Sequence, residues 1–315
     1  LFILVFLFSL IFLSLFIFFF FHKTDNKNLN SFNLFSKETS IIVNNWFMMY
    51  FLSVVLIGTI YPIFLDVISS EKISVGPPFY HKLIIPFLIP FLIAMTLGLK
   101  LKWIKSEIED KKNLIIFFLI SVLISILIVR NFDINFLIYT VLISSAFFLF
   151  FVTVRDFFAK KLNSFSQNIS HFGFSLLILS ILFNNFLTNE TIINLKIGQT
   201  YVAEKFIIKF EDVNQSSQKN YESVVGKFSV KNNTGKTDIL YPELRIYNQP
   251  NIVTSEAYIK TNFFLDKFMT MNYVQNEEYF NIRYQTKPLM LWIWISVILI
   301  SLGGLTSLFK KKYES

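Results

Sequence analysis

The sequence predicts a polytopic α-helical membrane protein with seven transmembrane helices and one inserted, mainly-β domain. Charged residues make up 16% of the chain and the mean hydropathy is +0.55, whereas a soluble domain has roughly 25% charged residues. Apolar runs of membrane-spanning length recur along the chain, and one polar stretch interrupts them at residues 188–287. Apolar residues alternate with polar ones in that stretch, which indicates strands there.

Seven stretches have the length and composition of transmembrane helices, which need roughly 20 apolar residues. They are Leu1–Phe21, Trp46–Leu65, Leu83–Leu99, Leu114–Val129, Phe136–Val154, Ile169–Leu187 and Pro288–Phe309. The fourth is the shortest, but nearly all of its residues are Leu, Ile, Val or Phe, which favours membrane insertion. The first lacks the charged start and the cleavage site of a signal peptide, so we interpret it as a span.

The charges of the loops predict the orientation. An odd number of spans places the two chain ends on opposite sides of the membrane. Fourteen basic residues fall on one side: Lys23, Lys27, Lys37, Lys100, Lys102, Lys105, Lys111, Lys112, Arg155, Lys160, Lys161, Lys310, Lys311 and Lys312. The short loops of the other side hold Lys72, Lys82 and Arg130. Because basic loops stay in the cytoplasm, we expect the C-terminus there and the N-terminus and residues 188–287 outside.

The predicted spans and the polar stretch divide the chain into three parts. These are residues 1–187 with six transmembrane helices and short loops, residues 188–287 with an antiparallel β domain, and residues 288–315 with the seventh helix and a basic tail. Period-two alternation places Phe206, Ile208 and Phe210 on one face of a strand. Asn232–Gly235 is a turn cluster between two such runs. We therefore expect a small antiparallel sandwich or barrel.

Composition excludes several functional classes. The chain has no cysteine, so it has no disulfide, no thiolate metal site and no thiol nucleophile. The formal net charge of +8 lies largely in the loops and reports topology, so no nucleic acid partner is expected. No phosphate-binding loop, nucleophile triad or intramembrane carboxylate pair is evident, so catalytic residues stay unassigned. The chain starts at Leu1 and its first methionine is Met48, which predicts either an unconventional start or the C-terminal part of a longer protein.

His171 is the most informative candidate for metal binding. It lies just inside the sixth predicted span, where Ser164, Asn168, His171 and Ser175 recur at i, i+4, i+7 and i+11. This spacing predicts one polar face on an apolar helix. A polar face within a span packs against protein or a cofactor, because lipid cannot satisfy its hydrogen bonds. The residues alone favour a hydrogen bond between helices over a ligand role.

The other two histidines are weaker candidates. His22 ends the first predicted span, and we interpret it as an interfacial residue. His81 lies beside Lys82 in a loop, and we interpret it as a solvated side chain. The predicted topology places His22 and His171 on the same side of the membrane, so a site formed by both histidines stays open.

A set of short motifs runs along nearly the whole chain. They are Ser36-Lys37-Glu38, Asn44-Asn45, Ile57–Pro62, Lys72–Tyr80, His171-Phe172-Gly173, Leu240–Glu243, Ser255-Glu256-Ala257, Lys287-Pro288, Trp292-Ile293-Trp294 and Leu302-Gly303-Gly304. In order and spacing they resemble the C-terminal half of the cytochrome c-type biogenesis protein CcmF, the heme lyase family of the cytochrome c maturation system. The string at 72–78 is the most specific of them.

The resemblance implies a component of the cytochrome c heme lyase, which attaches heme covalently to apocytochrome c and reduces the incoming heme through a bound heme b. It also implies that His171 is an axial ligand of that heme b and so binds the heme iron. The second axial histidine and a tryptophan-rich heme-handling segment precede this region in the family. The chain alone is therefore not expected to perform ligation.

The resemblance further implies the partners and the location. The partners are a heme-carrying periplasmic chaperone, apocytochrome c, the other cytochrome c maturation subunits and membrane lipid. The location is the bacterial inner (cytoplasmic) membrane, or an organellar inner membrane, with the N-terminus and residues 188–287 in the periplasm. The alternative is a non-catalytic membrane scaffold that docks the heme chaperone or apocytochrome c.

Overall fold

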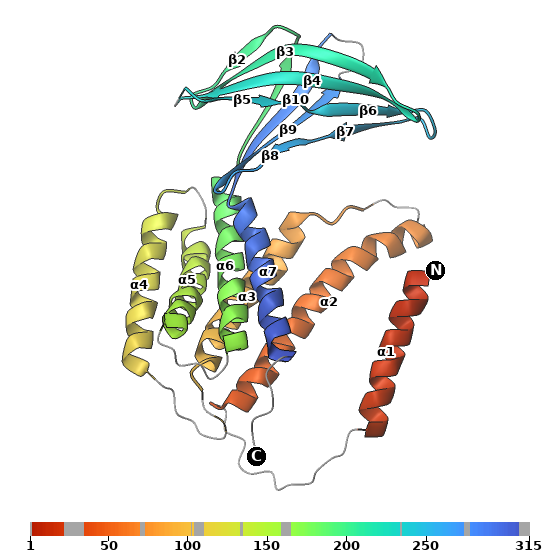
Figure 1. The fold of residues 1–315 in the computed structure, drawn as a ribbon. Helices are drawn as coiled ribbons and strands as arrows, with labels where there is room; N and C mark the ends of the chain where they lie inside the picture. The colour runs from red at the N-terminus through yellow and green to blue at the C-terminus, as the bar shows by residue number, and fades with distance from the viewer. Residues whose placement is uncertain are drawn as a thin grey trace.

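A computed structural model shows a β domain mounted at one end of a group of helices (Figure 1). The structure describes residues 2–21, 35–69, 73–101, 103, 110–132, 135–158, 165–233, 235–273 and 278–308. Helices precede and follow the β domain in the sequence, and the domain's strands run from β1 to β10 between α6 and α7. The predicted fold class, a polytopic helical membrane protein with an inserted mainly-β domain, is confirmed.

Within the described residues, six helices are long and apolar enough to cross a membrane. They are α2 (Lys37–Ser69), α3 (Pro77–Gly98), α4 (Lys111–Val129), α5 (Phe136–Phe158), α6 (Phe165–Leu187) and α7 (Met290–Leu308). The chain is therefore a multi-pass membrane protein. Helix α1 (Phe2–Phe21) stands apart from them in Figure 1. The apolar stretch Phe8–Ile17 of α1 is shorter than a membrane crossing, so the first predicted span stays a prediction.

Five helices start at other residues than the predicted spans; among them, α4 begins at Lys111 rather than Leu114 and α6 at Phe165 rather than Ile169. Helix α2 begins at Lys37 rather than Trp46, because the polar residues before Trp46 continue the helix instead of ending it. Helix α3 begins at Pro77 rather than Leu83, directly after Gly76. Proline suits the first helical turn, where its missing N–H leaves no hydrogen bond unmade. Pro288 ends the last strand, and α7 begins at Met290.

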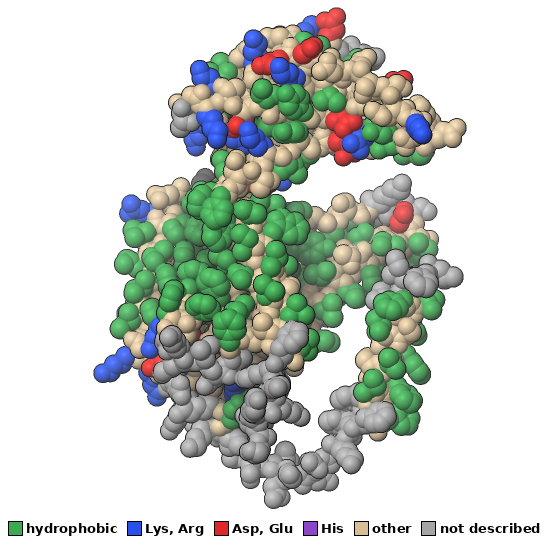
Figure 2. Space-filling view, in the orientation of Figure 1, with side chains coloured by type: hydrophobic (Ala, Val, Ile, Leu, Met, Phe, Trp, Pro, Cys, Tyr) green, Lys and Arg blue, Asp and Glu red, His purple; other side chains and the backbone are tan. Residues whose placement is uncertain are grey.

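Helix α5 is the most buried of the membrane helices, and it packs against α3, α4 and α6. Leu92 of α3, Leu142 and Leu149 of α5 and Leu179 of α6 form the apolar core between these helices. Apolar side chains also cover the outward face that Figure 2 shows, as expected for helices surrounded by lipid. Helix α2 leans away from this group and packs mainly on α3.

The β domain consists of two antiparallel sheets. The first has the order β1 (Asn189–Leu195), β10 (Phe280–Pro288), β9 (Leu265–Tyr273) and β8 (Tyr258–Lys260). The second has the order β2 (Thr200–Val202), β3 (Phe206–Ser217), β4 (Tyr221–Asn232), β6 (Glu243–Tyr247) and β7 (Ile252–Glu256), and β5 (Thr237–Leu240) also pairs with β4.

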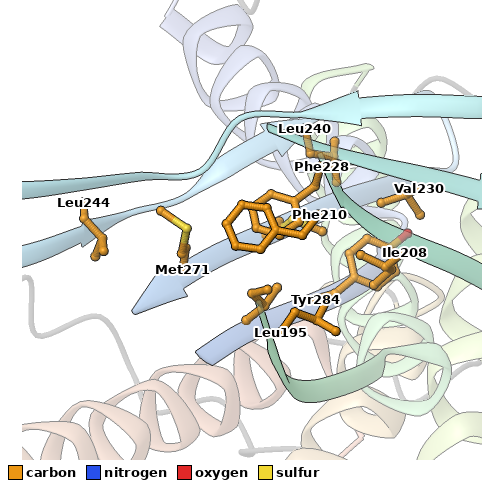
Figure 3. Packing of buried hydrophobic residues seen from close by; sticks show 11 residues of the cluster. Leu195, Ile208, Phe210, Phe228, Val230, Leu240, Leu244, Met271 and Tyr284 are labelled. Atoms are coloured by element: carbon orange, nitrogen blue, oxygen red, sulfur yellow. The ribbon is translucent and has the colours of Figure 1, made fainter. Parts of the chain in front are cut away.

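Inward-facing apolar residues of both sheets form the core of this domain (Figure 3). Phe210 and Phe228 stack with their ring centroids 4.3 Å apart, and both are fully buried. Ile208 is buried beside them and Phe206 packs against the same cluster, so the predicted shared face of β3 is confirmed. Gly235 has φ +81°, and its N–H donates to the Asn232 carbonyl over 2.9 Å, which confirms the predicted turn.

The β domain is mounted on α6 and α7 by two short connections. Helix α6 ends at Leu187 and β1 begins at Asn189, while Leu289 alone separates β10 from α7. The Asn184 side-chain amide donates to the Pro288 carbonyl over 2.6 Å and ties the two connections together. Since α6 and α7 also pack closely on each other, the domain rests on a two-helix stalk.

Candidate functional site

His171 faces a cavity of about 160 Å³ between α2, α3 and α6. The cavity lies where α2 and α6 begin and α3 ends, at the end of the bundle away from the β domain. Its lining residues are Lys37, Ser40, Ile41 and Asn44 of α2, Phe91, Ala94, Met95, Gly98 and Leu99 at the end of α3, and Gln167 and His171 of α6.

The packing of α6 against α7 fixes the direction of His171. Ser166 donates its hydroxyl to the Gly303 carbonyl over 2.6 Å. A Cβ added to Gly173 would lie 3.0 Å from the backbone of both Ser296 and Ile300, so glycine allows the two helices to approach. With this face of α6 held against α7, His171 is directed to the cavity beside α3 and α2.

The predicted polar face of this helix divides between the cavity and the packing of the bundle. Gln167 shares the cavity with His171, whereas Asn168 and Ser175 do not line it. Ser175 is fully buried and donates its hydroxyl to the Phe172 carbonyl over 2.8 Å. Ser164 lies outside the described residues. Positions i−3 and i−4 both lie near position i on a helix, so spacing could not decide between Asn168 and Gln167.

Three polar residues of α2 belong to the site and were missed in the sequence. Lys37, Ser40 and Asn44 recur at i, i+3 and i+7, which places them on one face of α2 toward the cavity. The spacing was visible in the sequence, but the predicted span began at Trp46 and left these residues in a loop. The Lys37 ammonium also lies 5.3 Å from the centre of the Trp103 ring.

The other two histidines do not join His171 within the described part of the chain. His81 lies in the first turns of α3, an exposed position far along the helix from Gly98 at the cavity. His22, which the sequence left open as a partner of His171, lies outside the described residues. Within the part of the chain that the structure describes, no three His, Asp or Glu side chains form a cluster that could hold a metal ion.

The cavity combines one imidazole with an apolar wall and a polar mouth. Phe91 is 2% exposed and forms the wall with Met95, while Lys37 and Ser40 bring polar groups to the opening. No hydrogen bond within the described residues engages the His171 imidazole, so either ring nitrogen can serve as a ligand. This donor set fits a flat apolar group that carries a metal and acidic substituents.

The size of the cavity limits how such a group would fit. An engineered cavity of roughly 150 Å³ holds one benzene ring. A macrocycle would therefore extend from the cavity of about 160 Å³ beyond its present walls. Helix α2 is the wall with the fewest contacts to the rest of the bundle, so a shift of α2 would widen the cavity at least cost.

The fold and the site define a class of protein. It is a multi-pass membrane protein with a β sandwich between its last two helices and a cavity, lined by one histidine, at the end of the helices away from the sandwich.

The family described as "CcmF C-terminal beta-sandwich" matches residues 186–288. The chain is 26% identical over 303 residues to the cytochrome c-type biogenesis protein CcmF of Pseudomonas fluorescens, covering 91% of this chain and 46% of that protein. CcmF of Escherichia coli (strain K12) is 25% identical over 302 residues, covering 93% and 46%.

A solved structure shows the same fold. The structure titled "Cytochrome c Heme Lyase CcmF" matches with a TM-score of 0.67 and 19% identity, covering 87% of this chain and 46% of that one. The resemblance to the C-terminal half of CcmF is thereby confirmed. The chain spans about half the length of the curated relatives that it matches.

Proposed function

We propose that this chain is a component of a cytochrome c heme lyase. It takes part in the covalent attachment of heme to apocytochrome c and in the reduction of incoming heme through a bound heme b. The similarity to CcmF supports the pathway. The single observation that supports heme b is His171, which presents an imidazole to a cavity walled by Phe91 and Met95.

His171 would hold the iron of this heme b through one of its imidazole nitrogens. Heme b supplies one-electron redox chemistry when bound. A ligating imidazole must be neutral, and the membrane-embedded position of His171 disfavours its charged form. Phe91 and Met95 would exclude water from the bound group, and Lys37 would offer a positive charge to an acidic substituent of it. The second ligand comes from another part of the assembled protein.

The proposed orientation follows from the basic loops. Residues 188–287 lie in the periplasm, where a heme-carrying chaperone and apocytochrome c reach the β domain, and the C-terminus lies in the cytoplasm. The other cytochrome c maturation subunits are further partners of the chain. The membrane is the bacterial inner membrane or its organellar counterpart.

Heme content of the assembled protein tests the proposal. We expect the purified protein to show a heme b absorption band and the His171→Ala variant to lose most of it. Alanine is well tolerated in a membrane helix, so the variant should still insert. His81→Ala is the matched control and should keep its heme. Unchanged heme in His171→Ala would contradict the assignment, and loss in His22→Ala would instead favour a His22–His171 pair.

The small cavity favours one alternative. If the cavity of about 160 Å³ does not open, the chain is a scaffold that docks the heme chaperone or apocytochrome c without binding heme. Wild-type assembled protein that lacks a heme band but retains apocytochrome c would support this alternative.

A further inference from the structure

The loop between β8 and β9, Thr261–Phe264, lies at the same level as the start of α7. The Leu289 N–H donates to the Phe264 carbonyl over 2.9 Å, and Leu289 directly precedes α7. Helix α7 is apolar from its first turn and long enough to cross the membrane. The loop therefore lies at the boundary between the membrane and water on the side of the β domain.

This loop carries two exposed aromatic side chains. Phe263 is 53% exposed and Phe264 is 64% exposed. Their rings are perpendicular with centroids 4.8 Å apart, and they lie 5.1 Å and 6.4 Å from the Trp292 ring of α7. Trp294, in the same turn of α7, is 63% exposed. The group formed by Phe263, Phe264, Trp292 and Trp294 is hereafter the aromatic cluster.

The loop holds these aromatic rings rigidly. The Asn262 N–H donates to the Asp266 carboxylate over 3.2 Å, and its side-chain amide donates to the Leu265 carbonyl over 3.3 Å. Lys287 of strand β10 pairs with Asp266, two residues after Phe264. A positive charge therefore lies on the strand next to the loop, and aromatic and basic residues together favour the headgroup region of a bilayer.

We propose that Phe263 and Phe264 insert into the headgroup region of the phospholipid bilayer on the β-domain side. The two covalent connections of the domain meet on the adjacent helices α6 and α7, so the chain itself attaches the domain to the bundle at one place. The inserted loop adds a third attachment through lipid and fixes the tilt of the domain over the membrane. The proposal is independent of heme binding.

Spin labelling of the full chain in lipid vesicles tests this insertion. The sequence contains no cysteine, so Phe264→Cys gives a single labelling site without further changes. The control is Val202→Cys in β2, which is 70% exposed on the part of the domain away from the helices. Both nitroxide-labelled variants are reconstituted into phosphatidylethanolamine–phosphatidylglycerol vesicles, and their collisions with oxygen and with a water-soluble nickel complex are measured.

We expect the ratio of oxygen to nickel accessibility to be higher at Phe264→Cys than at Val202→Cys, because oxygen concentrates in lipid. Phe263→Cys should give the same result and guards against a local disturbance by one substitution. Equal, water-like ratios at the loop and control positions would overturn the proposal. A label shielded from both reagents would also overturn it, since another protein segment would then cover the loop.

Discussion

Asp238 shows how single residues hold the two sheets of the β domain together. Its carboxylate on β5 accepts hydrogen bonds from Lys260 of β8 and Lys267 of β9, each over 2.6 Å. Asp238 is 3% exposed and the Lys267 side chain is 4% exposed. Lys267 also donates to the Asn232 side-chain oxygen over 3.2 Å. The second sheet is thereby fastened to the first through buried charges.

We expect Asp238→Asn to destabilise the β domain strongly. The substitution leaves the buried ammonium of Lys267 without its counter-charge, which typically costs about 3–5 kcal/mol. Hydrogen exchange of the full chain, followed by mass spectrometry on peptides from β5 and β9, measures the loss of protection. Glu211→Gln is the control: it removes the half-exposed pair with Lys227, 2.8 Å long, and should change little. Equal protection in both variants would contradict this account of the sheets.

The same carboxylate predicts a pH dependence. Hydrogen bonds from Lys260 and then Lys267 lower the pKa of Asp238 to about 2, whereas an unfolded Asp has a pKa of about 3.9. The unfolded chain therefore binds the proton first as the pH falls. The stabilisation is complete above the unfolded pKa, declines below it and is lost near pH 2. Exchange protection of β5 should fall over this range in the wild type and much less in Asp238→Asn.

At the scale of elements, the close contact of α6 and α7 determines where His171 points and carries the β domain. A Cβ on Gly303 would overlap the Ser170 hydroxyl and lie 2.8 Å from the Ser170 backbone nitrogen. A Cβ on Gly304 would meet nothing within 4 Å. Gly303 therefore lies in the contact between α6 and α7, whereas the adjacent Gly304 faces open space.

We expect Gly303→Leu to separate α6 from α7 and to lower the thermal stability of the protein in detergent. The larger side chain forces the backbones apart, because the obstructing atoms include main-chain atoms that cannot rotate away. Gly304→Leu is the matched control and should leave the melting temperature nearly unchanged. Similar melting temperatures for both variants would show that the two helices do not pack as described.

The pattern of the sequence predicted which helices and strands exist better than it predicted the residues at which they begin and end. Apolar length identified the membrane helices, and period-two alternation located the face of β3 that holds Ile208 and Phe210. The start of α3 was missed because Pro77 and Pro78 occur both in loops and in first helical turns. The start of α2 was missed because Lys37, Ser40 and Asn44 are polar residues that line a cavity inside the bundle. Hydropathy alone cannot distinguish that role from a solvated loop.

At the scale of the whole molecule, the site joins segments that are distant in the sequence. His171 could be singled out in the sequence, whereas its cavity neighbours on α2 and α3 lie more than seventy residues earlier. Helix α2 packs on α3, and α3 and α6 both pack on α5, so the cavity depends on contacts between apolar side chains of distant segments. Such contacts have no local signature in the sequence.

The orientation of the molecule is also open to a direct test. The uneven distribution of Lys and Arg predicts residues 188–287 in the periplasm and the C-terminus in the cytoplasm. Alkaline phosphatase, which is active only in the periplasm, should be active when fused after Asn232 and inactive when fused after Ser315. The reverse pattern would contradict the orientation.

The central claim is that the His171 imidazole binds the iron of a heme b in the cavity between α2, α3 and α6. The most direct measurement is the visible absorption spectrum of the assembled His171→Gly variant, supplied with heme, before and after imidazole is added. Glycine removes the ligand and leaves room for free imidazole, so the account predicts a heme b band that is lost in the variant and restored by imidazole. A band that is unchanged by the substitution, or lost and not restored in a folded protein, would contradict the claim.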